Sequence, residues 1–309
     1  MIKNMVLDHQ SNTQLYAKPN DYCLNEAAWA IAHSCNDPTI VSDLIDVVSM
    51  AKNYVVEKGK GKGKGCSHAA MMPMYSACLA GIMNSHYSEE DGELDSGMKC
   101  DIEGLVNEAT RGESNEDKVD VFLNLIRSCS ACGEKSGEAI GVFFDEMTKR
   151  GIARDIKFYR AAAGSLSKSL KHRKLAEYEK LARDMIADES NECGLWSQHG
   201  EGFCDLHKHS VELALGHLKV CVDAALEKGG GVVDLVIICG LEKNRGEKGT
   251  GTGILGSVMK IGGGGGGGAI EMDGSGNPGR LRICGKANLM IVKRMMEEDE
   301  GHNNNSQLK

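Results

Sequence analysis

The chain has 309 residues, enough for about two domains that each bury a substantial core, because domains typically run to about 100–200 residues. Its net charge of −8 argues against a nucleic-acid partner for the chain as a whole, since phosphate backbones attract Lys and Arg. The acidic excess lies in residues 1–116, 188–203 and 297–309, whereas residues 117–187 and 204–296 are mildly basic, which permits nucleic-acid contact there.

The 12 cysteines stand without a regular framework, which argues against a disulfide scaffold and favours a reduced intracellular protein. No apolar run approaches the roughly 20 residues of a membrane span, so we expect no membrane partner. The first fifteen residues contain Asp8 and lack the features of a signal or transit peptide. Either the protein is not targeted by such a segment, or that segment is not in this chain.

After an N-terminal stretch at 1–19 that we expect to be disordered, the pattern predicts helices at Tyr22–Cys35, Thr39–Glu57, Met71–His86 and Asp101–Ala109. The Lys-Gly run Lys58–Gly65 and the acidic run Glu89–Asp95 interrupt them as solvated loops.

Two further segments, 119–151 and 156–187, correspond to each other at a near-constant spacing. Each predicts a helix–turn–helix pair, and Ala139, Phe143 and Met147 recur every four residues as the apolar stripe of a packed helix. Residues 20–187 therefore predict an N-terminal α-helical repeat solenoid, clearest over 117–187.

Residues 188–203 predict an acidic linker, after which the composition changes to α/β over 204–296. The expected elements are a strand, a helix, a central strand, a short helix, a strand and a last helix, at Phe203–His207, Ser210–Lys228, Val232–Cys239, Ile254–Ile261, Arg280–Cys284 and Ala287–Glu297. Glycines 262–268 predict a flexible insertion, and we expect a disordered tail at 297–309.

Asp205 and His207 stand two residues apart in a strand-like run, so their side chains should project from one face. A carboxylate beside an imidazole suits binding or cutting of a phosphodiester. In a cutting mechanism His207 would act as general acid or base, and Asp205 would orient it or hold a divalent cation, Mg²⁺ or Mn²⁺. One carboxylate is a poor cage for a metal.

The loop 241–252 leads into a helix N-terminus, where free backbone N–H groups and the helix dipole attract phosphate. We expect this region to bind nucleic acid and to stabilise phosphate charge through Lys243 or Arg245. The candidate binding residues in and beside the loop are Gly240, Lys243, Asn244, Arg245, Lys248, Gly251 and Gly253.

Residues 117–187 resemble the pentatricopeptide repeat family, and residues 20–112 resemble it poorly. The matching positions are Phe122, Leu125, Ile126, Gly133, Ala139, Phe144, Met147, Gly151, Ile152 and Asp155. In that family the residue after the opening aromatic and the last residue of each repeat read one RNA base. The resemblance assigns these roles to Leu123 with Asp155, and to Arg160 in the next repeat. Leu123 has no polar atom, so weak or sequence-tolerant RNA contact is expected, or none.

Residues 204–296 resemble the Smr (small MutS-related) domain. Asp205, Leu206 and His207 match its D-L-H opening, and residues 277–281 match its late N-P-G segment, which includes Arg280 as a candidate binding residue. The family's middle T-G-x-G stands here as Cys-Gly-Leu-Glu at 239–242, and Lys208 replaces the usual glycine after the histidine; both departures favour binding over cleavage. The resemblance implies a two-layer α/β sandwich that contacts nucleic acid, with endonuclease activity in some members.

Two other patterns compete with this interpretation. The glycines in Gly251-x-Gly253-x-x-Gly256 have the spacing of the dinucleotide-binding motif. That motif must follow a strand directly, whereas about a dozen residues separate these glycines from the preceding strand. A zinc site is conceivable from the cluster Cys193, His199, Cys204, His207 and His209. Alternation along a strand would place Cys204 and His207 on opposite faces, which argues against it. Cys129 and Cys132 form a lone CxxC for which core packing is the default.

The sequence thus predicts α plus α/β architecture, with a helical repeat solenoid before a two-layer Smr-like sandwich. RNA is the favoured partner and DNA the second choice. The alternative is a non-catalytic repeat scaffold for protein partners, with an inactive Smr-like domain. The repeat resemblance implies a mitochondrial or chloroplast location, although no presequence is visible.

Overall fold

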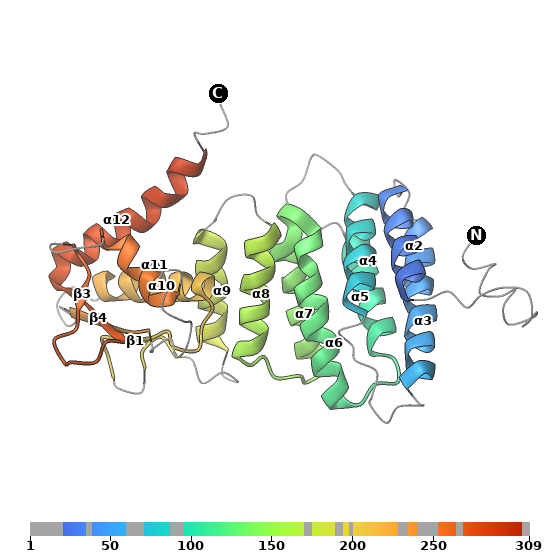
Figure 1. The fold of residues 1–309 in the computed structure, drawn as a ribbon, viewed down its shortest axis with the longest axis horizontal. Coiled ribbons are helices and arrows are strands. Elements are labelled where there is room, and N and C mark those ends of the chain that lie inside the picture. Colours follow the sequence, from blue (N-terminus) through green and yellow to red (C-terminus); the bar gives the residue numbers. More distant parts are fainter. Residues whose placement is uncertain are drawn as a thin grey trace, which may run out of the picture. The chain divides into compact units, whose positions relative to one another are not determined.

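A computed structural model describes residues 21–34, 39–59, 71–86, 96–169, 175–188, 194–197, 200–227, 234–239, 253–263 and 268–304. The described chain is mostly helical and carries one small mixed sheet in its C-terminal part, which confirms the α plus α/β class (Figure 1). The chain divides into two compact units, residues 1–153 and 154–309. Within the described parts, every helix is too short or too polar to cross a bilayer.

The first unit is all helical in its described residues. Its elements are α2 (Asp21–Ser34), α3 (Thr39–Gly59), α4 (Met72–Ser85), α5 (Ser96–Thr110), α6 (Asn115–Ser128), the 3₁₀ helix η2 (Cys129–Lys135) and α7 (Ser136–Lys149). Helix α4 packs against α2 and α6, while α5 packs against α3 and α7, so alternate helices form neighbouring rows (Figure 1). The predicted helical pairs of this region are therefore present, and a true repeat solenoid stays a proposal.

Apolar stripes build the core of this unit. The predicted stripe Ala139, Phe143 and Met147 is fully buried on α7, and Phe122 is equally buried on α6. Gly151 ends the last turn of α7 with φ +66°, a left-handed conformation that favours glycine, and Ile152 N donates to Met147 O. Local sequence thus sets both the inward face of the helix and its end.

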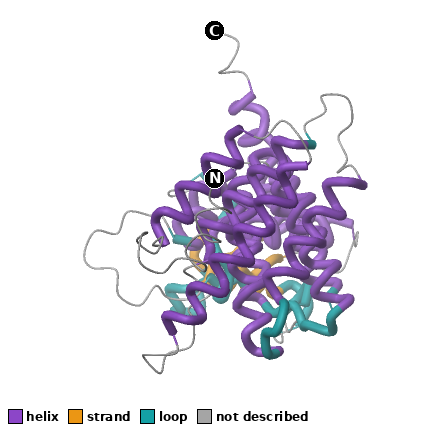
Figure 2. The backbone as a smooth tube through the Cα atoms, turned by 90° about the vertical axis from the view of Figure 1, so that its right-hand side faces the viewer, coloured by secondary structure: helices purple, strands orange, loops and turns teal. Residues whose placement is uncertain are grey.

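The second unit combines helices with the sheet. Its elements are α8 (Ile156–Ser169), α9 (Leu175–Ala187), β1 (Phe203–Asp205), α10 (Val211–Glu227), β2 (Asp234–Ile238), α11 (Ile254–Ile261), β3 (Glu271–Met272), β4 (Arg280–Cys284) and α12 (Gly285–Asn304). The strand order is β1-β2-β4-β3; β1 and β2 run parallel, and the other pairs are antiparallel. Figure 2 shows the strands as a small part of a largely helical chain.

Burial alternates along the three longer strands, so the two faces of the sheet differ. Cys204, Leu235, Ile237, Leu281 and Ile283 point into a core that includes residues of α10 and α12. The intervening side chains of the same strands are only partly buried. Strand β2 is central, as predicted, but its apolar run is buried on one face alone because the described helices cover one side of the sheet.

The boundary between the units lies at Ala153–Arg154, not in the predicted linker 188–203. Helix α9 packs against α10 so closely that a Cβ on Gly216 would lie 2.2 Å from the Tyr178 carbonyl oxygen. In the described part of the expected linker, Leu195 and Trp196 pack on the core of the second unit. The Gly216 contact therefore joins α9, which was predicted as part of the repeats, to the second unit, and the two apolar side chains join part of the expected linker to it.

Several element ends differ from expectation. Strand β1 stops at Asp205, because the next residues form a turn in which His209 N donates to Leu206 O. Helix α12 continues to Asn304, so most of the stretch expected to be a disordered tail is helical. The short strand β3 was not predicted; with two exposed residues it carries no alternating apolar pattern. The expected loop 89–95 and glycines 264–267 lie outside the described residues.

Candidate nucleic-acid interface

The Asp205–His207 pair lies at the carboxyl end of β1. Asp205 Oδ1 accepts a hydrogen bond from the backbone N–H of His207 at 3.1 Å. The same oxygen also contacts Nδ1 of the His207 ring. The His207 side chain is 45% exposed, so solvent reaches the imidazole while the carboxylate fixes its orientation. The predicted proximity is confirmed, although it arises from a turn after the strand rather than from two positions on one strand.

A second motif segment reaches the same edge of the sheet. Asp205 pairs with Ile238 on β2, and Ile238 pairs with Arg280 on β4, so these three residues form one row across the sheet. Leu206 N donates to Ile238 O at 2.8 Å, and Cys239 N donates to Gly279 O at 2.9 Å. The D-L-H and N-P-G segments, far apart in sequence, therefore flank the same end of β2.

The Asn277 side chain shapes this corner. Its Oδ1 accepts from Gly279 N at 3.0 Å, while its backbone carbonyl accepts from Arg280 N at 3.1 Å. These two bonds close a tight turn immediately before β4. They fix the position at which Arg280 begins the strand. Arg280 is partly buried, and its Nε makes no hydrogen bond within the described residues. The Nε–H group of Arg280 is thus a buried donor that a ligand could use, at the edge of the sheet that also carries Asp205.

The partly exposed face of the sheet carries both signs of charge. Arg282 lies two residues beyond Arg280 on this face, in register with Val236 and Phe203. Its Nη2 pairs with Asp234 Oδ2 at 2.5 Å, and Asp234 Oδ1 accepts from Gly285 N at 2.9 Å. The Arg282 guanidinium, with a smaller effect of the Gly285 N–H, lowers the pKa of Asp234. The face offers an aromatic side chain and arginines without forming a purely basic patch.

The repeat-derived candidates occupy different environments. Leu123 is buried on α6 of the first unit. Asp155 accepts from Lys157 N at 2.8 Å through Oδ1, which caps the start of α8. Arg160 is exposed on α8, close enough to the imidazoles of the second unit to affect His209.

The pKa of His209 is shifted strongly. Burial, followed by the positive charges of His217, His207 and Arg160, lowers it to about 3. His209 therefore stays neutral at physiological pH, and its environment places His207 and Arg160 in one electrostatic neighbourhood.

Most loop candidates cannot be placed. Gly240, Lys243, Asn244, Arg245, Lys248 and Gly251 lie outside the described residues. Gly253 precedes α11 in an extended conformation and provides no side-chain cap. Cys193 and His199 of the considered zinc set also lie outside them, while Cys204 is fully buried and His207 is exposed. The opposite placement of these two side chains agrees with the sequence argument against that set.

A buried group of titratable side chains was missed by the sequence analysis. Cys204 on β1 lies beside His217 and Cys221, which stand four residues apart on α10. Burial alone would raise the pKa of Cys221, but the neighbouring Cys204 and His217 side chains lower it to about 6. The four-residue spacing of His217 and Cys221 was the available signal, hidden beside the more obvious leucine and valine stripe.

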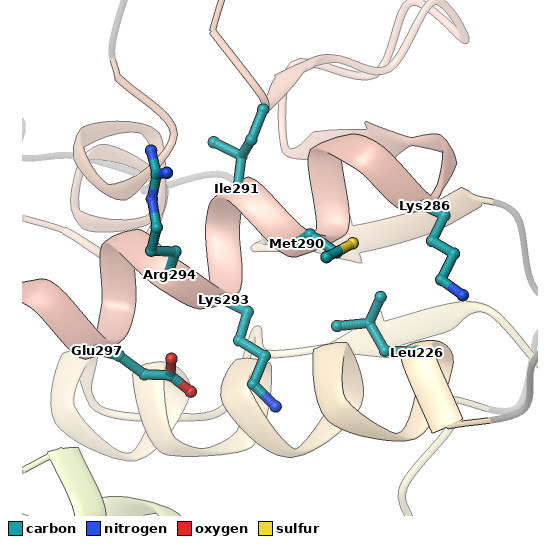
Figure 3. A pocket seen from close by; sticks show the side chains of 7 residues that line it. All are labelled: Leu226, Lys286, Met290, Ile291, Lys293, Arg294 and Glu297. Atoms are coloured by element: carbon teal, nitrogen blue, oxygen red, sulfur yellow. The ribbon is translucent and has the colours of Figure 1, made fainter.

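An open groove of about 510 Å³ was also not predicted. It is lined by Leu226 of α10 and, on α12, by Lys286, Met290, Ile291, Lys293, Arg294 and Glu297 (Figure 3). Met290 is 58% exposed and Ile291 40% exposed, so the wall combines apolar and basic side chains. The groove belongs to the helical layer and contains no residue of the Asp205–His207 edge.

Comparison of the chain with known protein families, with curated proteins and with solved structures found no match.

Proposed function

We propose that this protein binds RNA through the edge of its C-terminal sheet, as a repeat protein with an Smr-like domain. The observation that carries the proposal is the convergence of the D-L-H and N-P-G segments at the end of β2. It brings an oriented imidazole and the Arg280 guanidinium to one edge. Arginine and imidazole groups are suited to contact phosphate oxygens.

The topology supports the same proposal. The order β1-β2-β4-β3, with a helix between the parallel strands and helices against one face, fits the two-layer sandwich implied by the Smr resemblance. The other face presents Phe203 with Arg280 and Arg282 on its partly exposed side. An aromatic ring near guanidinium groups is a surface on which single-stranded bases and phosphates can both be held.

Cleavage is the secondary part of the proposal. Asp205 fixes one edge of the His207 ring, which leaves Nε2 as the atom that would transfer a proton to or from a phosphodiester. The Asp205 contact with His207 N is also the ordinary hydrogen bond of a tight turn, so this pair has a structural role as well. Asp205 is the single carboxylate in contact with His207 among the described residues, and a Mg²⁺ or Mn²⁺ ion would need ligands from the substrate or water.

Binding can be tested by fluorescence anisotropy with labelled single-stranded RNA and DNA at two salt concentrations. Arg280→Ala should weaken binding and lower the salt slope by about 1, because one phosphate contact is lost. Arg183→Ala is the matched control, since Arg183 is an exposed arginine on α9 paired with Glu179. Affinity that is indifferent to salt, or equal losses in both variants, would contradict an interface at this edge.

Cleavage needs a separate assay with end-labelled RNA and DNA in the presence of Mg²⁺ or Mn²⁺. Asp205→Asn should abolish cleavage while retaining RNA affinity, and His207→Ala should abolish cleavage while weakening binding by no more than one phosphate contact. Lys208→Ala, at the exposed neighbouring position, should cut normally. Equal cleavage by wild type and both variants would assign the nuclease to a contaminant or another site. Binding without cleavage would leave the first part of the proposal standing and remove the second.

The alternative function, a scaffold for protein partners, is favoured by one observation in the repeats. Leu123 is buried and Asp155 caps a helix, so neither position offers a base-reading group. Ultraviolet crosslinking of bound RNA followed by peptide mapping separates the two functions. The RNA proposal expects crosslinks in residues 203–210 and 277–284 and none in α6; the scaffold alternative expects none anywhere in the chain.

A further inference from the structure

A compact group of metal-ligating side chains lies inside the second unit, beneath the sheet. The ligand atoms of Cys204, His217 and Cys221 all lie within 4.8 Å of one another. Cys204 and Cys221 are 0% exposed and His217 is 1% exposed. This group lies on the covered side of β1, on the face opposite the side chain of Asp205, and the His209–His217 hydrogen bond connects it to the turn that carries His207.

The secondary structure explains why these three side chains meet. Cys204 is the central residue of β1 and points toward the helices, while residues four apart on α10 project from one side of that helix. His217 and Cys221 therefore form a pair that faces a strand thiol. Distances of about 2.3 Å from zinc to sulfur and about 2.1 Å to nitrogen require only small side-chain movements from a group of this size.

The state of His217 provides a second, independent observation. Its Nδ1 lies 3.0 Å from Nε2 of His209, and the two rings are 5.0 Å apart. Its Nε2 is buried and has no hydrogen-bond partner among the described residues. When Nδ1 donates to His209, Nε2 carries no proton, and its lone pair is available to a metal ion. Metal-ligating histidines are typically oriented by such a hydrogen bond from the other ring nitrogen.

We propose that Cys204, His217 and Cys221 bind a zinc ion that joins β1 to α10. Two thiolates and an imidazole form the soft ligand set that zinc prefers, and full burial is typical of structural zinc sites. On binding, both thiols release their protons to solvent, and the Cys221 Sγ–Leu195 O hydrogen bond, 3.2 Å long, is replaced by the sulfur–zinc bond.

Cys239 is the candidate fourth ligand. It follows β2, is 6% exposed, and its thiol interacts electrostatically with that of Cys204. Since Cys204 pairs with Ile237, Cys239 stands two residues along the neighbouring strand on the same buried face. A Cys₃His set would close the coordination sphere and make the ion structural. Cys239 stands where the T-G-x-G motif of the Smr family has threonine, and zinc binding would give this cysteine a structural role.

The first experiment measures metal in the full-length protein purified under reducing conditions. We expect one zinc per chain by elemental analysis, and thiolate-to-cobalt charge-transfer absorption after replacement of zinc by Co²⁺. Cys221→Ser and Cys204→Ser should each weaken that absorption, and Cys239→Ser should weaken it if the fourth ligand is a thiolate. Cys129→Ser is the matched control, because this cysteine is equally buried in the other unit; its absorption should equal that of wild type.

A substitution at His209 tests whether this residue orients the His217 ring, and it removes none of the proposed zinc ligands. His209→Ala should lower zinc affinity by about 10- to 100-fold, as expected for loss of the hydrogen-bond partner of a metal-bound histidine, while the charge-transfer absorption at saturating Co²⁺ is retained. If affinity is unchanged, the proposed orientation of His217 is wrong. If the absorption itself disappears, His209 is a ligand and the proposed set is wrong.

A measurement on the wild-type protein keeps the test independent of variants that fail to fold. Cys204 and Cys221 should be protected from alkylation by N-ethylmaleimide, and a chelator should lift that protection while leaving Cys78 and Cys129 protected. A protein that takes up no zinc and shows no effect of the chelator overturns the proposal. A disulfide between Cys204 and Cys221 in freshly purified, unreduced protein would overturn it as well. Failure here would not contradict RNA binding, because zinc uptake and RNA affinity are measured separately and are proposed for different side chains.

Discussion

The two units bury their polar groups in different ways. In the helical unit, buried hydroxyls donate to backbone carbonyls, as when Thr110 donates to Val106 O and Ser128 donates to Asn124 O and Met72 O. In the α/β unit, buried polar groups bond to one another across elements, as His209 does with His217 and as Lys293 of α12 does with Asp223 of α10. The first arrangement pairs hydroxyls with the backbone, whereas the second pairs side chains that can ionise or bind a ligand.

The two units also differ at a glycine where two helices approach each other closely. A Cβ on Gly81, in the helical unit, would meet the flexible end of the Leu44 side chain at 2.3 Å. A Cβ on Gly216, in the α/β unit, would meet the Tyr178 backbone. A side chain can rotate away and a backbone cannot. The helix contact at Gly216 therefore tolerates an added methyl group less than the contact at Gly81 does.

The largest expected effect concerns the helical core. Phe122→Ala should destabilise the first unit by about 4 kcal/mol, because a fully buried ring is replaced by a cavity. Hydrogen-exchange mass spectrometry should show faster exchange in α6 and α7 and little change in α10. Met72→Ala, at a 38% exposed position of the same unit, should change stability by less than about 0.5 kcal/mol. Equal acceleration in both units would show that they unfold together.

The next effect concerns the α9–α10 contact. Gly216→Ala should destabilise the second unit by about 3 kcal/mol, because the added methyl group forces two backbones apart. Gly164→Ala on α8 is the control; its Cβ would meet nothing within 4 Å, and alanine should stabilise that helix by about 0.5–1 kcal/mol. Denaturant titrations followed by hydrogen exchange distinguish the two. A harmless Gly216→Ala would contradict the close packing that joins α9 to the α/β unit.

Local pattern was sufficient to predict the regular elements. The helix predicted at Ile254–Ile261 and the strand at Arg280–Cys284 have the observed bounds, and the helix predicted at Ser210–Lys228 begins one residue later because the Ser210 hydroxyl accepts from Leu213 N. These elements depend on periodicity and capping, which are encoded within a few residues. The unit boundary was not predictable in this way, because it depends on the contact of Gly216 with Tyr178.

The candidate site was partly predictable for the same reason. Asp205 and His207 are close in sequence and were expected to be neighbours, whereas the buried group around His217 brings a strand residue to a helix pair. That meeting depends on how α10 packs against β1, and no local pattern contains it. Buried imidazoles at the edge of an apolar stripe are easily taken for core residues, which is how His217 was overlooked.

A smaller effect tests the ion cluster between α10 and α12. Burial alone would raise the pKa of Asp223, but Lys219 at 2.5 Å and Lys293 at 2.7 Å outweigh it and lower the pKa. The stability contributed by this group is therefore present above the unfolded pKa of about 4 and is lost as pH falls through the lower folded value.

Asp223→Asn should accordingly cost about 2 kcal/mol at pH 7, and the difference from wild type should shrink at pH values well below 4. Glu227→Gln, at the exposed end of the same helix, is the control and should behave like wild type at both pH values. Urea titrations across this pH range provide the measurement. A constant difference between Asp223→Asn and wild type at every pH would show that charge is not the source of the stabilisation.

The smallest effect returns to the helical unit and its local bonding. Ser114 precedes α6; its Oγ accepts from Asp117 N at 3.2 Å and donates to Asp117 Oδ2 at 2.6 Å. Ser114→Ala should cost about 1 kcal/mol by removing this cap, and Ser114→Asp should recover most of the loss. The change should appear as faster exchange at the start of α6 without altering α10. An effect spread over both units would mean that even this single cap stabilises more than the helix that it begins.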